Sequence, residues 1–326
     1  MFDGGVVSSV IELFRARREE DNRVLAQRRE EIYKVVPEIE AIDARLRECA
    51  LEAASLTFSA PDPVEAVRTV GKKSLDLQAT RCELLVSKGY PYDYLNFRYR
   101  CKNCSDNGFI GSEPCDCFKE ECKREQSRQL SAVLDTDGCS FRTFRLDYYS
   151  DVYDDKWGAS ARGNMKINLD ICRDFADEFG GEAKNLLLYG GPGLGKTFLS
   201  SCIAANVVAR GYSVVYDTAY NLFLNLENER FNRATDEGRA ANRRYFNCDL
   251  LILDDLGTEI SGAFATAALY NLLNTRLLKK KSTAVNTNLH IDELERRYSP
   301  QIHSRIAGEF TPLFFFGEDI RTLKRR

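Results

Sequence analysis

The chain contains a glycine-rich stretch whose residue types and spacing suit phosphate binding, GGPGLGKT at residues 190–197. Its pattern, G-x-x-x-x-G-K-T, is that of a P-loop, in which backbone N–H groups point at phosphate oxygens. We expect the Lys196 ammonium to contact the β- and γ-phosphates of ATP and the Thr197 hydroxyl to ligate Mg²⁺. The alternative is a glycine-rich turn that binds nothing, which the complete motif disfavours. The residues expected to contact nucleotide here are Gly190, Gly191, Pro192, Gly193, Leu194, Gly195, Lys196, Thr197 and Phe198.

Two adjacent carboxylates end a second apolar run, DLLILDDLG at residues 249–257. This is the Walker B arrangement, in which Asp254 is expected to hold Mg²⁺ through water and Asp255 to orient or deprotonate the attacking water. Many ATPases have the longer Glu at the second position, so the pattern indicates the role of Asp255 less strongly than that of Asp254. Glu259, in the following GTE, is a further candidate carboxylate near the site.

Two later polar residues are candidates for the same chemistry. Asn288 ends the β-rich run STAVNTN, where its amide could touch the γ-phosphate and the attacking water; a plain turn role is the alternative. Arg305 lies in ERRYSPQIHSRIAGEF, far from the P-loop in sequence. An arginine that reaches the γ-phosphate of a neighbouring subunit would make hydrolysis depend on assembly, and a surface salt bridge is the alternative.

Four cysteines have the spacing of metal ligands, Cys101-x-x-Cys104 and Cys115-x-Cys117, separated by a short polar loop that contains glycine. Each close pair can supply one edge of a tetrahedron, so the pattern predicts a structural zinc site. Cys122 is a spare that could replace one ligand. A redox dithiol is the alternative, but it would leave the second pair unexplained.

The elements that must position these residues alternate along the chain. Apolar runs at 186–189, 212–219, 249–257, 282–288 and 313–316 are expected to be strands, with helical spacing at 167–179, 198–208 and 222–244. Such alternation predicts an α/β fold, a parallel five-stranded sheet with helices on both faces and phosphate at the carboxyl ends of the strands. Aromatic residues at 139–151 could form one wall of an adenine pocket, although such residues more often pack a domain edge.

The first hundred residues have a different pattern. Residues 6–35 are charged with a thin apolar stripe, Pro37 is well placed to begin a second helix, and PDP at 61–63 separates it from a third helix that ends near Gly89. A further charged helix is expected from Phe118 to about Leu134. We interpret the first three helices as a helical N-terminal domain that binds a partner; a purely structural appendage or a dimerisation arm is the alternative.

Composition limits the class of protein. The chain has 326 residues, 29% charged and 44% hydrophobic, which fits about two globular domains. The net charge of -3 is nearly balanced, so nucleic-acid contacts must rest on local basic groups. The candidates are Lys279, Lys280 and Lys281, with Lys324, Arg325 and Arg326. No apolar run approaches the ~20 residues of a membrane span, so we expect no membrane association and a cytoplasmic location, in which the eleven cysteines stay reduced.

Several stretches together resemble the AAA+ ATPases of the bacterial replicative helicase loaders, the DnaC and DnaI type. They are GGPGLGKTFLSSCIAANVVARG, LLILDDLGTE, NTNLHIDEL and HSRIAGEF, and the likeness extends over about residues 141–321. The resemblance implies that Lys196 and Thr197 are Walker A residues, Asp254 and Asp255 Walker B residues, Asn288 the sensor-1 residue, Arg305 the arginine finger and Arg321 a second sensor.

The resemblance also implies a function. The helical N-terminus with CKNC and CDC is similar to loaders in which this region binds zinc and docks on the hexameric replicative DNA helicase. The chain would then be an ATPase that uses ATP, Mg²⁺ and Zn²⁺, assembles through its ATPase domain, and places a helicase on single-stranded DNA at replication initiation. The predicted domains are a partner-binding domain at 1–98, a zinc-binding element at 99–125 and an AAA+ domain at 126–326.

Two features keep alternatives open. Only about ten residues follow Phe316, so the helical lid of most AAA+ proteins is expected to be absent, as it is in loaders of this group. The transposition ATPases of the IstB type share the same core but differ in their N-terminal part. A replication ATPase of a phage or mobile element is a further alternative.

Overall fold

The computed structural model describes the chain in six stretches, residues 2, 4–59, 61–133, 139–230, 236–260 and 262–323. It has two compact units, Ile11–Cys115 and a unit made of Met1–Val10 with Asp116–Arg326. The three-part division predicted from the sequence is finer than this one and stays a prediction. The basic tail of residues 324–326 lies outside the described residues.

The larger unit is built on a parallel sheet. Its strands are β5 (Leu186–Gly190), β6 (Val214–Thr218), β7 (Leu250–Leu256), β8 (Ser282–Thr287) and β9 (Thr311–Phe315). They lie in the order β6-β7-β8-β5-β9, and every neighbouring pair is parallel. The predicted α/β fold with a parallel five-stranded sheet is therefore confirmed.

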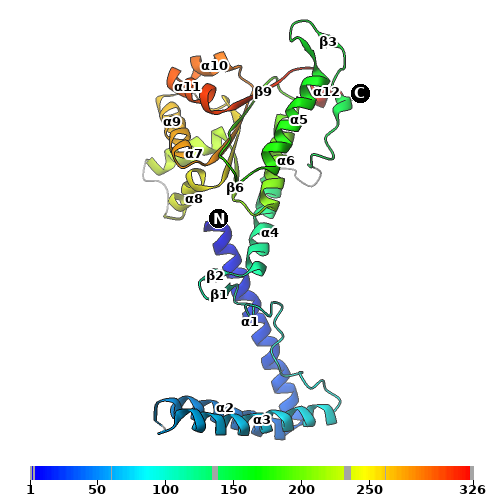
Figure 1. The fold of residues 1–326 in the computed structure, drawn as a ribbon, viewed down its shortest axis with the longest axis vertical. Coiled ribbons are helices and arrows are strands. Elements are labelled where there is room, and N and C mark those ends of the chain that lie inside the picture. The colour runs from blue at the N-terminus through cyan, green and yellow to red at the C-terminus, as the bar shows by residue number, and fades with distance from the viewer. Residues whose placement is uncertain are drawn as a thin grey trace. The chain divides into compact units, whose positions relative to one another are not determined.

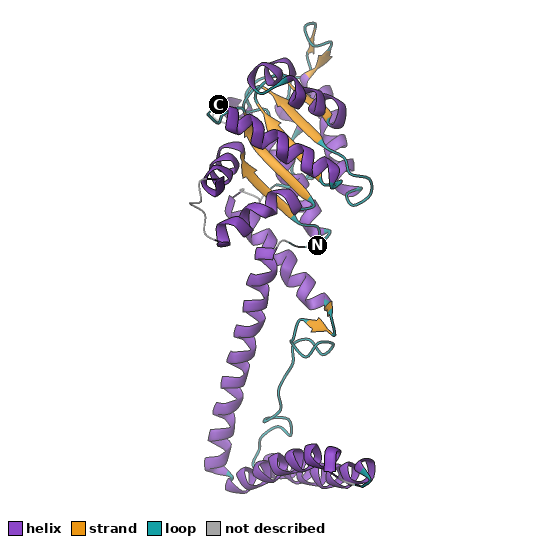
Figure 2. Ribbon diagram, turned by 90° about the vertical axis from the view of Figure 1, so that its left-hand side faces the viewer, coloured by secondary structure: helices purple, strands orange, loops and turns teal. Residues whose placement is uncertain are grey.

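Helices cover both faces of this sheet (Figures 1 and 2). In chain order they are α4 (Asp116–Val133), α5 (Ala161–Asp177), α6 (Lys196–Ala209), α7 (Ala219–Arg230), α8 (Asp236–Asn247), α9 (Ala263–Leu278), α10 (Ile291–Arg297), α11 (Pro300–Glu309) and α12 (Ile320–Leu323). A short 3₁₀ helix, η1 (Leu146–Tyr148), and the hairpin β3 (Tyr153–Asp154) with β4 (Ala159–Ser160) precede α5. Within the described residues β9 is followed only by the single turn of α12.

The central strands are buried on both faces, as their continuous apolar runs predict. In β5, Leu186 and Leu188 pack in one core cluster with α5 and α6, whereas Leu187 packs in the other with α7 and α9. In β7, Ile252 and Leu253 divide in the same way. The sheet is therefore a rigid platform for whatever its carboxyl ends carry.

The helical predictions were less accurate than the strand predictions. Of the helix expected at 222–244, the described residues belong to α7 and α8, and residues 231–235 lie outside the described residues. The helix expected at 167–179 begins earlier, because Ser160 caps α5 by accepting a hydrogen bond of 3.1 Å from the Gly163 N–H. Two helices, α10 and α11, lie between the last two strands, where the sequence reading had proposed no element.

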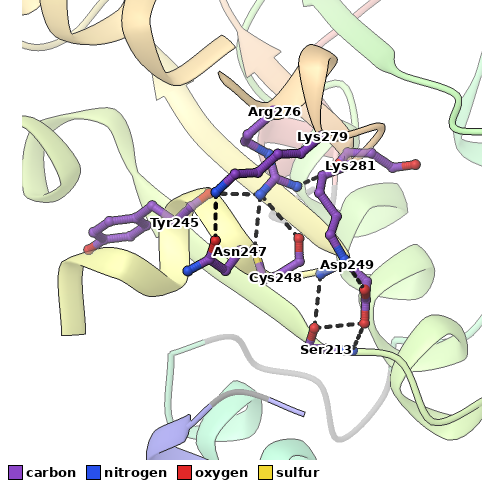
Figure 3. Close-up of polar contacts among 9 residues, drawn as sticks. Ser213, Tyr245, Asn247, Cys248, Asp249, Arg276, Lys279 and Lys281 are labelled. Atoms are coloured by element: carbon purple, nitrogen blue, oxygen red, sulfur yellow. Dashed lines mark hydrogen bonds and ion pairs between the residues drawn. The ribbon is translucent and has the colours of Figure 1, made fainter. Parts of the chain in front are cut away.

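A buried arginine fixes the amino ends of β7 and β8 (Figure 3). Arg276 on α9 is fully buried, and its guanidinium donates to Tyr245 O at 2.7 Å, Cys248 O at 3.2 Å and Thr283 Oγ1 at 2.9 Å. Burying this charge without such partners would be unfavourable, so the contacts bind α9 to the end of α8 and to β8.

The lysines expected to be candidate nucleic-acid contacts lie beside this arginine (Figure 3). Lys281 forms an ion pair of 2.6 Å with Asp249, whose other oxygen accepts from the Ser213 hydroxyl at 2.8 Å. Lys279 donates to Asn247 Oδ1 at 2.8 Å. Two of the three consecutive lysines are therefore engaged in contacts within the fold.

The smaller unit contains the three N-terminal helices that the sequence predicts. They are α1 (Gly4–Val35, of which residues 11–35 belong here), α2 (Pro37–Ser59) and α3 (Pro63–Ser87). Helices α2 and α3 form a hairpin, and Asp62 caps α3 by accepting from the Glu65 N–H at 3.2 Å. A small core holds the hairpin to α1 and to the segment after α3; its buried residues are Ile32, Val36, Ile39, Leu85 and Leu95.

The cysteine-rich segment follows this hairpin and contains two short antiparallel strands, β1 (Phe109–Ile110) and β2 (Glu113–Pro114). Among the described helices of the whole chain, none combines the length and apolar character that crossing a bilayer requires.

Candidate nucleotide site and cysteine cluster

A cavity of about 520 Å³ lies at the carboxyl end of β5. The P-loop residues 192–198 form its floor, and Thr143 to Tyr149 contribute to one wall. Asp255, Asn288 and Arg321 also line it. The structure thus brings together residues from five separate parts of the chain at the edge where phosphate binding is expected.

Two P-loop glycines are required by their surroundings. Gly193 has φ of +71°, and a Cβ there would lie 1.8 Å from Asp319 Oδ1. Gly195, at φ of +92°, caps α6, and a Cβ there would lie 2.7 Å from the Tyr149 hydroxyl oxygen. Both positions therefore need glycine for conformation and for space, and they leave backbone N–H groups at the start of α6, where anions are favoured.

Lys196 is held by oxygen atoms around the P-loop. Its Nζ donates to Gly190 O at 2.7 Å, Gly191 O at 2.6 Å and Asn288 Oδ1 at 2.8 Å. Burial lowers the pKa of Lys196 from 10.5 to about 8; the charges of Asp254 and Asp255 oppose this shift. The ammonium therefore lies at the floor of the cavity and is poorly hydrated, an arrangement that favours binding a phosphate.

Asp254 is buried and accepts hydrogen bonds on both carboxylate oxygens. Thr197 Oγ1 donates to Oδ2 at 3.1 Å, Asn286 Nδ2 donates to Oδ1 at 3.0 Å, and the Tyr216 hydroxyl also donates to Oδ2. The proximity of the Thr197 hydroxyl and the carboxylate is what a Mg²⁺ site of a P-loop ATPase needs, so these residues fit the ion.

Asn286 and Tyr216 are contacts of Asp254 that the sequence reading missed. Asn286 lies 1% exposed in β8 and also donates to Ser200 Oγ at 2.9 Å. An amide inside this β-rich run was the available signal, because buried polar side chains need partners. Tyr216 gave no comparable signal.

Asp255 has an unusual backbone conformation. Its φ is +54°, and the β7–β8 pairing is irregular between Leu253 and Leu256. Such irregularities re-aim side chains and occur near active sites. Burial and the neighbouring charge of Asp254 raise the pKa of Asp255, while Lys196 and Arg321 lower it. A carboxylate with a raised pKa in the cavity suits proton transfer from water.

Of the remaining predicted site residues, two line the cavity and one lies outside it. Asn288 and Arg321 line the cavity, and Arg321 lies close enough to Lys196 and Asp255 to influence the pKa of each. Arg305 lies outside it, on α11, where its guanidinium is 5.2 Å from the Tyr270 ring centroid and donates to the Tyr270 hydroxyl at 3.3 Å. A single chain therefore does not bring Arg305 to its own P-loop cavity.

Glu259 also lies outside the cavity. Its side chain turns toward α10, where it accepts from the Tyr298 hydroxyl, and it accepts from the Gly257 N–H at 2.9 Å. The interpretation of Glu259 as a second carboxylate of the nucleotide site is therefore wrong, because its oxygens are occupied by these buried donors.

The aromatic segment before the nucleotide domain lines the cavity. Phe144 and Tyr149 are stacked with centroids 5.8 Å apart, and Phe198 lies 5.7 Å from Phe144. Arg145 lies over the Tyr148 ring at 4.6 Å. Flat apolar surfaces of this kind suit a nucleotide base, so the expected base wall agrees with this lining.

The four predicted zinc ligands come together. The sulfur atoms of Cys101, Cys104, Cys115 and Cys117 all lie within 4.8 Å of one another. The Cys101 and Cys115 sulfurs are 3.7 Å apart, close to the ~3.8 Å expected for two thiolates on one tetrahedral zinc ion.

Backbone geometry around the cluster also suits thiolates. The Gly108 N–H donates to Cys104 Sγ at 3.3 Å, and the buried Asp106 accepts from the Cys101 N–H at 2.7 Å. Such donors orient metal ligands. Cys122 is buried in α4 and is not one of the four clustered sulfurs, and burial raises its pKa to about 11. The residues present therefore fit a structural zinc ion.

Comparison with known proteins finds similarity over the nucleotide domain. Residues 170–302 match the family model described as IstB-like ATP binding protein. The replicative helicase loader DnaC of Escherichia coli K12 is 24% identical over 168 residues, 52% of this chain and 62% of that protein. The DnaC of Buchnera aphidicola subsp. Baizongia pistaciae is 25% identical over 175 residues, 51% of this chain and 65% of that protein. The chain thus covers less than two thirds of these relatives.

Two solved structures are similar to part of this chain. A crystal structure of the DnaC helicase loader superimposes with a TM-score of 0.47 at 20% identity and covers 56% of this chain and 99% of that chain. A crystal structure of DnaI gives a TM-score of 0.46 at 22% identity and covers 57% and 93%. The P-loop and the Walker B pair both lie within residues 170–302, the part of the chain that is similar to the IstB-like ATP binding proteins.

Proposed function

We propose that this protein is an ATP-dependent loader that binds a replicative DNA helicase and delivers it to single-stranded DNA at replication initiation. The carrying observation is that Lys196, Thr197 and Asn288 line one cavity and that Thr197 donates a hydrogen bond to the buried Asp254. Arg305 projects from another part of the same domain. Relatives named replicative helicase loaders match over half of the chain, which supports this choice among ATPases.

In the proposed reaction the P-loop binds the triphosphate of ATP. Lys196 exchanges its contacts with Gly190 O and Gly191 O for phosphate oxygens. Thr197 and Asp254 would hold Mg²⁺, which neutralises phosphate charge when bound. Asp255 orients the attacking water and accepts its proton, and Asn288 contacts the γ-phosphate.

We infer that hydrolysis requires a second copy of the chain. Arg305 cannot serve the cavity of its own subunit as placed, and its side chain is supported by Tyr270 on a partly exposed surface. A guanidinium delivered to the neighbouring γ-phosphate would stabilise charge that develops in the transition state. The rate of ATP hydrolysis would then depend on the assembly of subunits.

The α2–α3 hairpin is the proposed helicase contact. Three of its apolar side chains are largely exposed, Leu51 at 73%, Phe58 at 92% and Val64 at 79%. Apolar side chains that stay in water on a small helical unit are typical of a protein-binding surface. The zinc ion held by the four cysteines would stabilise the segment that follows the hairpin.

ATP binding and hydrolysis by two variants test the enzymatic part of this proposal. Lys196→Ala should abolish ATP binding, whereas Arg305→Ala should leave ATP binding intact and lower hydrolysis only at concentrations where subunits assemble. Arg296→Ala, which removes another exposed arginine from the neighbouring α10, is the matched control. Full activity in both test variants would contradict the proposal.

The family match favours one alternative, a transposition ATPase of the IstB type or a related ATPase of a phage or mobile element. Such a protein would form ATP-dependent filaments on duplex DNA and would bind no replicative helicase. Electron microscopy of the protein with duplex DNA and ATP distinguishes the two functions.

A further inference from the structure

The segment after the Walker B strand is tied to the α10–α11 turn through one buried carboxylate. Glu259 is 4% exposed, accepts from the Gly257 N–H at 2.9 Å and accepts from the Tyr298 hydroxyl. Arg297 Nε lies 3.5 Å from Glu259 Oε1, and the same guanidinium donates to the Glu259 backbone oxygen. Three groups from two separate segments thus meet at one side chain.

One end of this connection lies at the nucleotide cavity. The Thr258 N–H and hydroxyl donate to Asp255 O at 3.1 Å and 2.9 Å, and both residues line the cavity. Only Leu256 separates Asp255 from Gly257, and Thr258 follows Gly257 directly, so the proposed water-orienting residue and the Glu259 contact belong to the same tight turn.

The other end lies at the start of the helix that carries Arg305. Tyr298 is the C-terminal cap of α10, and the next residue, Ser299, is the N-terminal cap of α11 and accepts from the Ile302 N–H at 3.3 Å. Arg305 lies less than two helical turns beyond this cap. A displacement of Tyr298 therefore acts directly on the position of α11.

The turn between the two ends has little freedom to absorb movement. Gly257 has φ of +104°, and a Cβ there would lie 2.5 Å from Leu289 Cδ1. Thr287 Oγ1 donates to Leu256 O and so holds the preceding residue to β8. Breaking the buried Glu259 contacts is also unfavourable, because the carboxylate would lose its partners away from water.

We propose that Glu259 is a positioning residue that couples the nucleotide cavity of one subunit to the Arg305 that this subunit offers to its neighbour. The inference rests on the proposed function, since it assumes that Arg305 acts on a neighbouring subunit. Changes at Asp255 and Thr258 when ATP binds or is hydrolysed reach α11 through Glu259 and Tyr298. The state of one site thereby sets the activity of the next.

The test compares ATP affinity with assembly-dependent hydrolysis in the full-length protein. Glu259→Gln cannot accept from both donors as the carboxylate does, and Tyr298→Phe removes one hydroxyl but keeps the ring. We expect both variants to bind an ATP analogue within about twofold of the unmodified protein and to lose about tenfold of the assembly-dependent kcat. Glu295→Gln, an exposed glutamate on α10, is the matched control and should change neither quantity.

Combination with Arg305→Ala separates positioning from a local structural effect. If Glu259 acts through Arg305, then adding Glu259→Gln or Tyr298→Phe to Arg305→Ala should cause no further loss of kcat. A further loss in the double variant would overturn the proposal, because Glu259 would then act on its own nucleotide site. Unchanged kcat in Tyr298→Phe would also overturn it, even where Glu259→Gln unfolds early.

Failure of the proposed function gives a different result. In that case Arg305→Ala alone leaves the assembly-dependent rate unchanged. If Arg305→Ala lowers the rate while Glu259→Gln and Tyr298→Phe do not, only the coupling proposal is wrong.

Discussion

Lys196 and Asn288 lie 92 positions apart in the chain and are joined by a hydrogen bond of 2.8 Å between Nζ and Oδ1. The bond connects the P-loop to the end of β8 and places the amide beside the group expected to contact the γ-phosphate. We therefore expect this pair of side chains to respond when a phosphate binds between the two segments.

Replacement of Asn288 should separate ATP binding from hydrolysis. Asn288→Ala removes a polar contact to the reacting phosphate and water, so we expect kcat to fall about 10²-fold while ATP affinity changes little. Phosphate release and binding of a slowly hydrolysed ATP analogue measure the two quantities. Asn271→Ala, on the exposed side of α9, is the control and should leave both unchanged.

The buried ammonium of Lys196 predicts a pH dependence of ATP binding. Its pKa is about 8 in the folded protein, and phosphate oxygens would raise that pKa on binding. Affinity for ATP should therefore weaken about tenfold from about pH 7 to about pH 9, because the bound state holds a proton that the free protein has lost. Lys196→Arg, whose guanidinium stays protonated, should bind with a flatter pH profile. Identical profiles would exclude Lys196 as the titrating group.

The same shift has a consequence for folding stability. The unfolded lysine keeps its proton up to about 10.5, whereas the folded one loses it near 8, so the unfolded state binds more protons between these values. The contribution of Lys196 to the free energy of unfolding should accordingly rise with pH across this window. Urea denaturation at several pH values, compared with Lys196→Met, measures that contribution.

The cysteine cluster predicts one zinc ion per chain. Cys104→Ser should abolish stoichiometric zinc in the purified protein and lower the thermal stability of the N-terminal unit, since metal binding and folding of such sites are coupled. Elemental analysis measures the metal. Cys82→Ser, outside the cluster, should keep it. A protein that purifies without zinc and retains its melting temperature after chelation would contradict the assignment.

Loss of the buried Arg276 guanidinium at the amino ends of β7 and β8 should destabilise the larger unit. Arg276→Ala leaves the carbonyls of Tyr245 and Cys248 without their donor, and we expect a loss of about 3 kcal/mol or more in the free energy of unfolding. Trp157 is the only tryptophan and packs 4.7 Å from Phe314, so its fluorescence reports unfolding of this unit. Lys279→Ala, which removes an exposed contact beside it, should cost less than about 0.5 kcal/mol.

Short sequence motifs were enough to predict much of the nucleotide site and of the cysteine cluster. The P-loop, the Walker B pair and the two cysteine pairs are short motifs whose spacing reflects one local geometry, so the sequence alone predicted their convergence. Asn288 was predicted because the carboxyl ends of parallel strands meet at one edge of the sheet.

Other features depend on register and long-range packing. Which side chain of β6 or β8 faces Asp254 depends on strand pairing, so the contacts of Tyr216 and Asn286 could not be predicted from spacing. Glu259 was misplaced because proximity in sequence to Asp255 suggested a shared cavity, whereas buried donors on α10 turn the side chain away. Helix α11 begins with Ser299-Pro300, a recognisable start signal that the sequence reading did not use.

Co-elution of the full-length protein with the replicative helicase hexamer of the same cell, on a sizing column with ATP, tests the loader function most directly. The loader function predicts a stable complex that Phe58→Ser weakens without unfolding the protein, since this side chain is 92% exposed. Absence of co-elution under every nucleotide condition would contradict a helicase loader and favour a transposition-type ATPase.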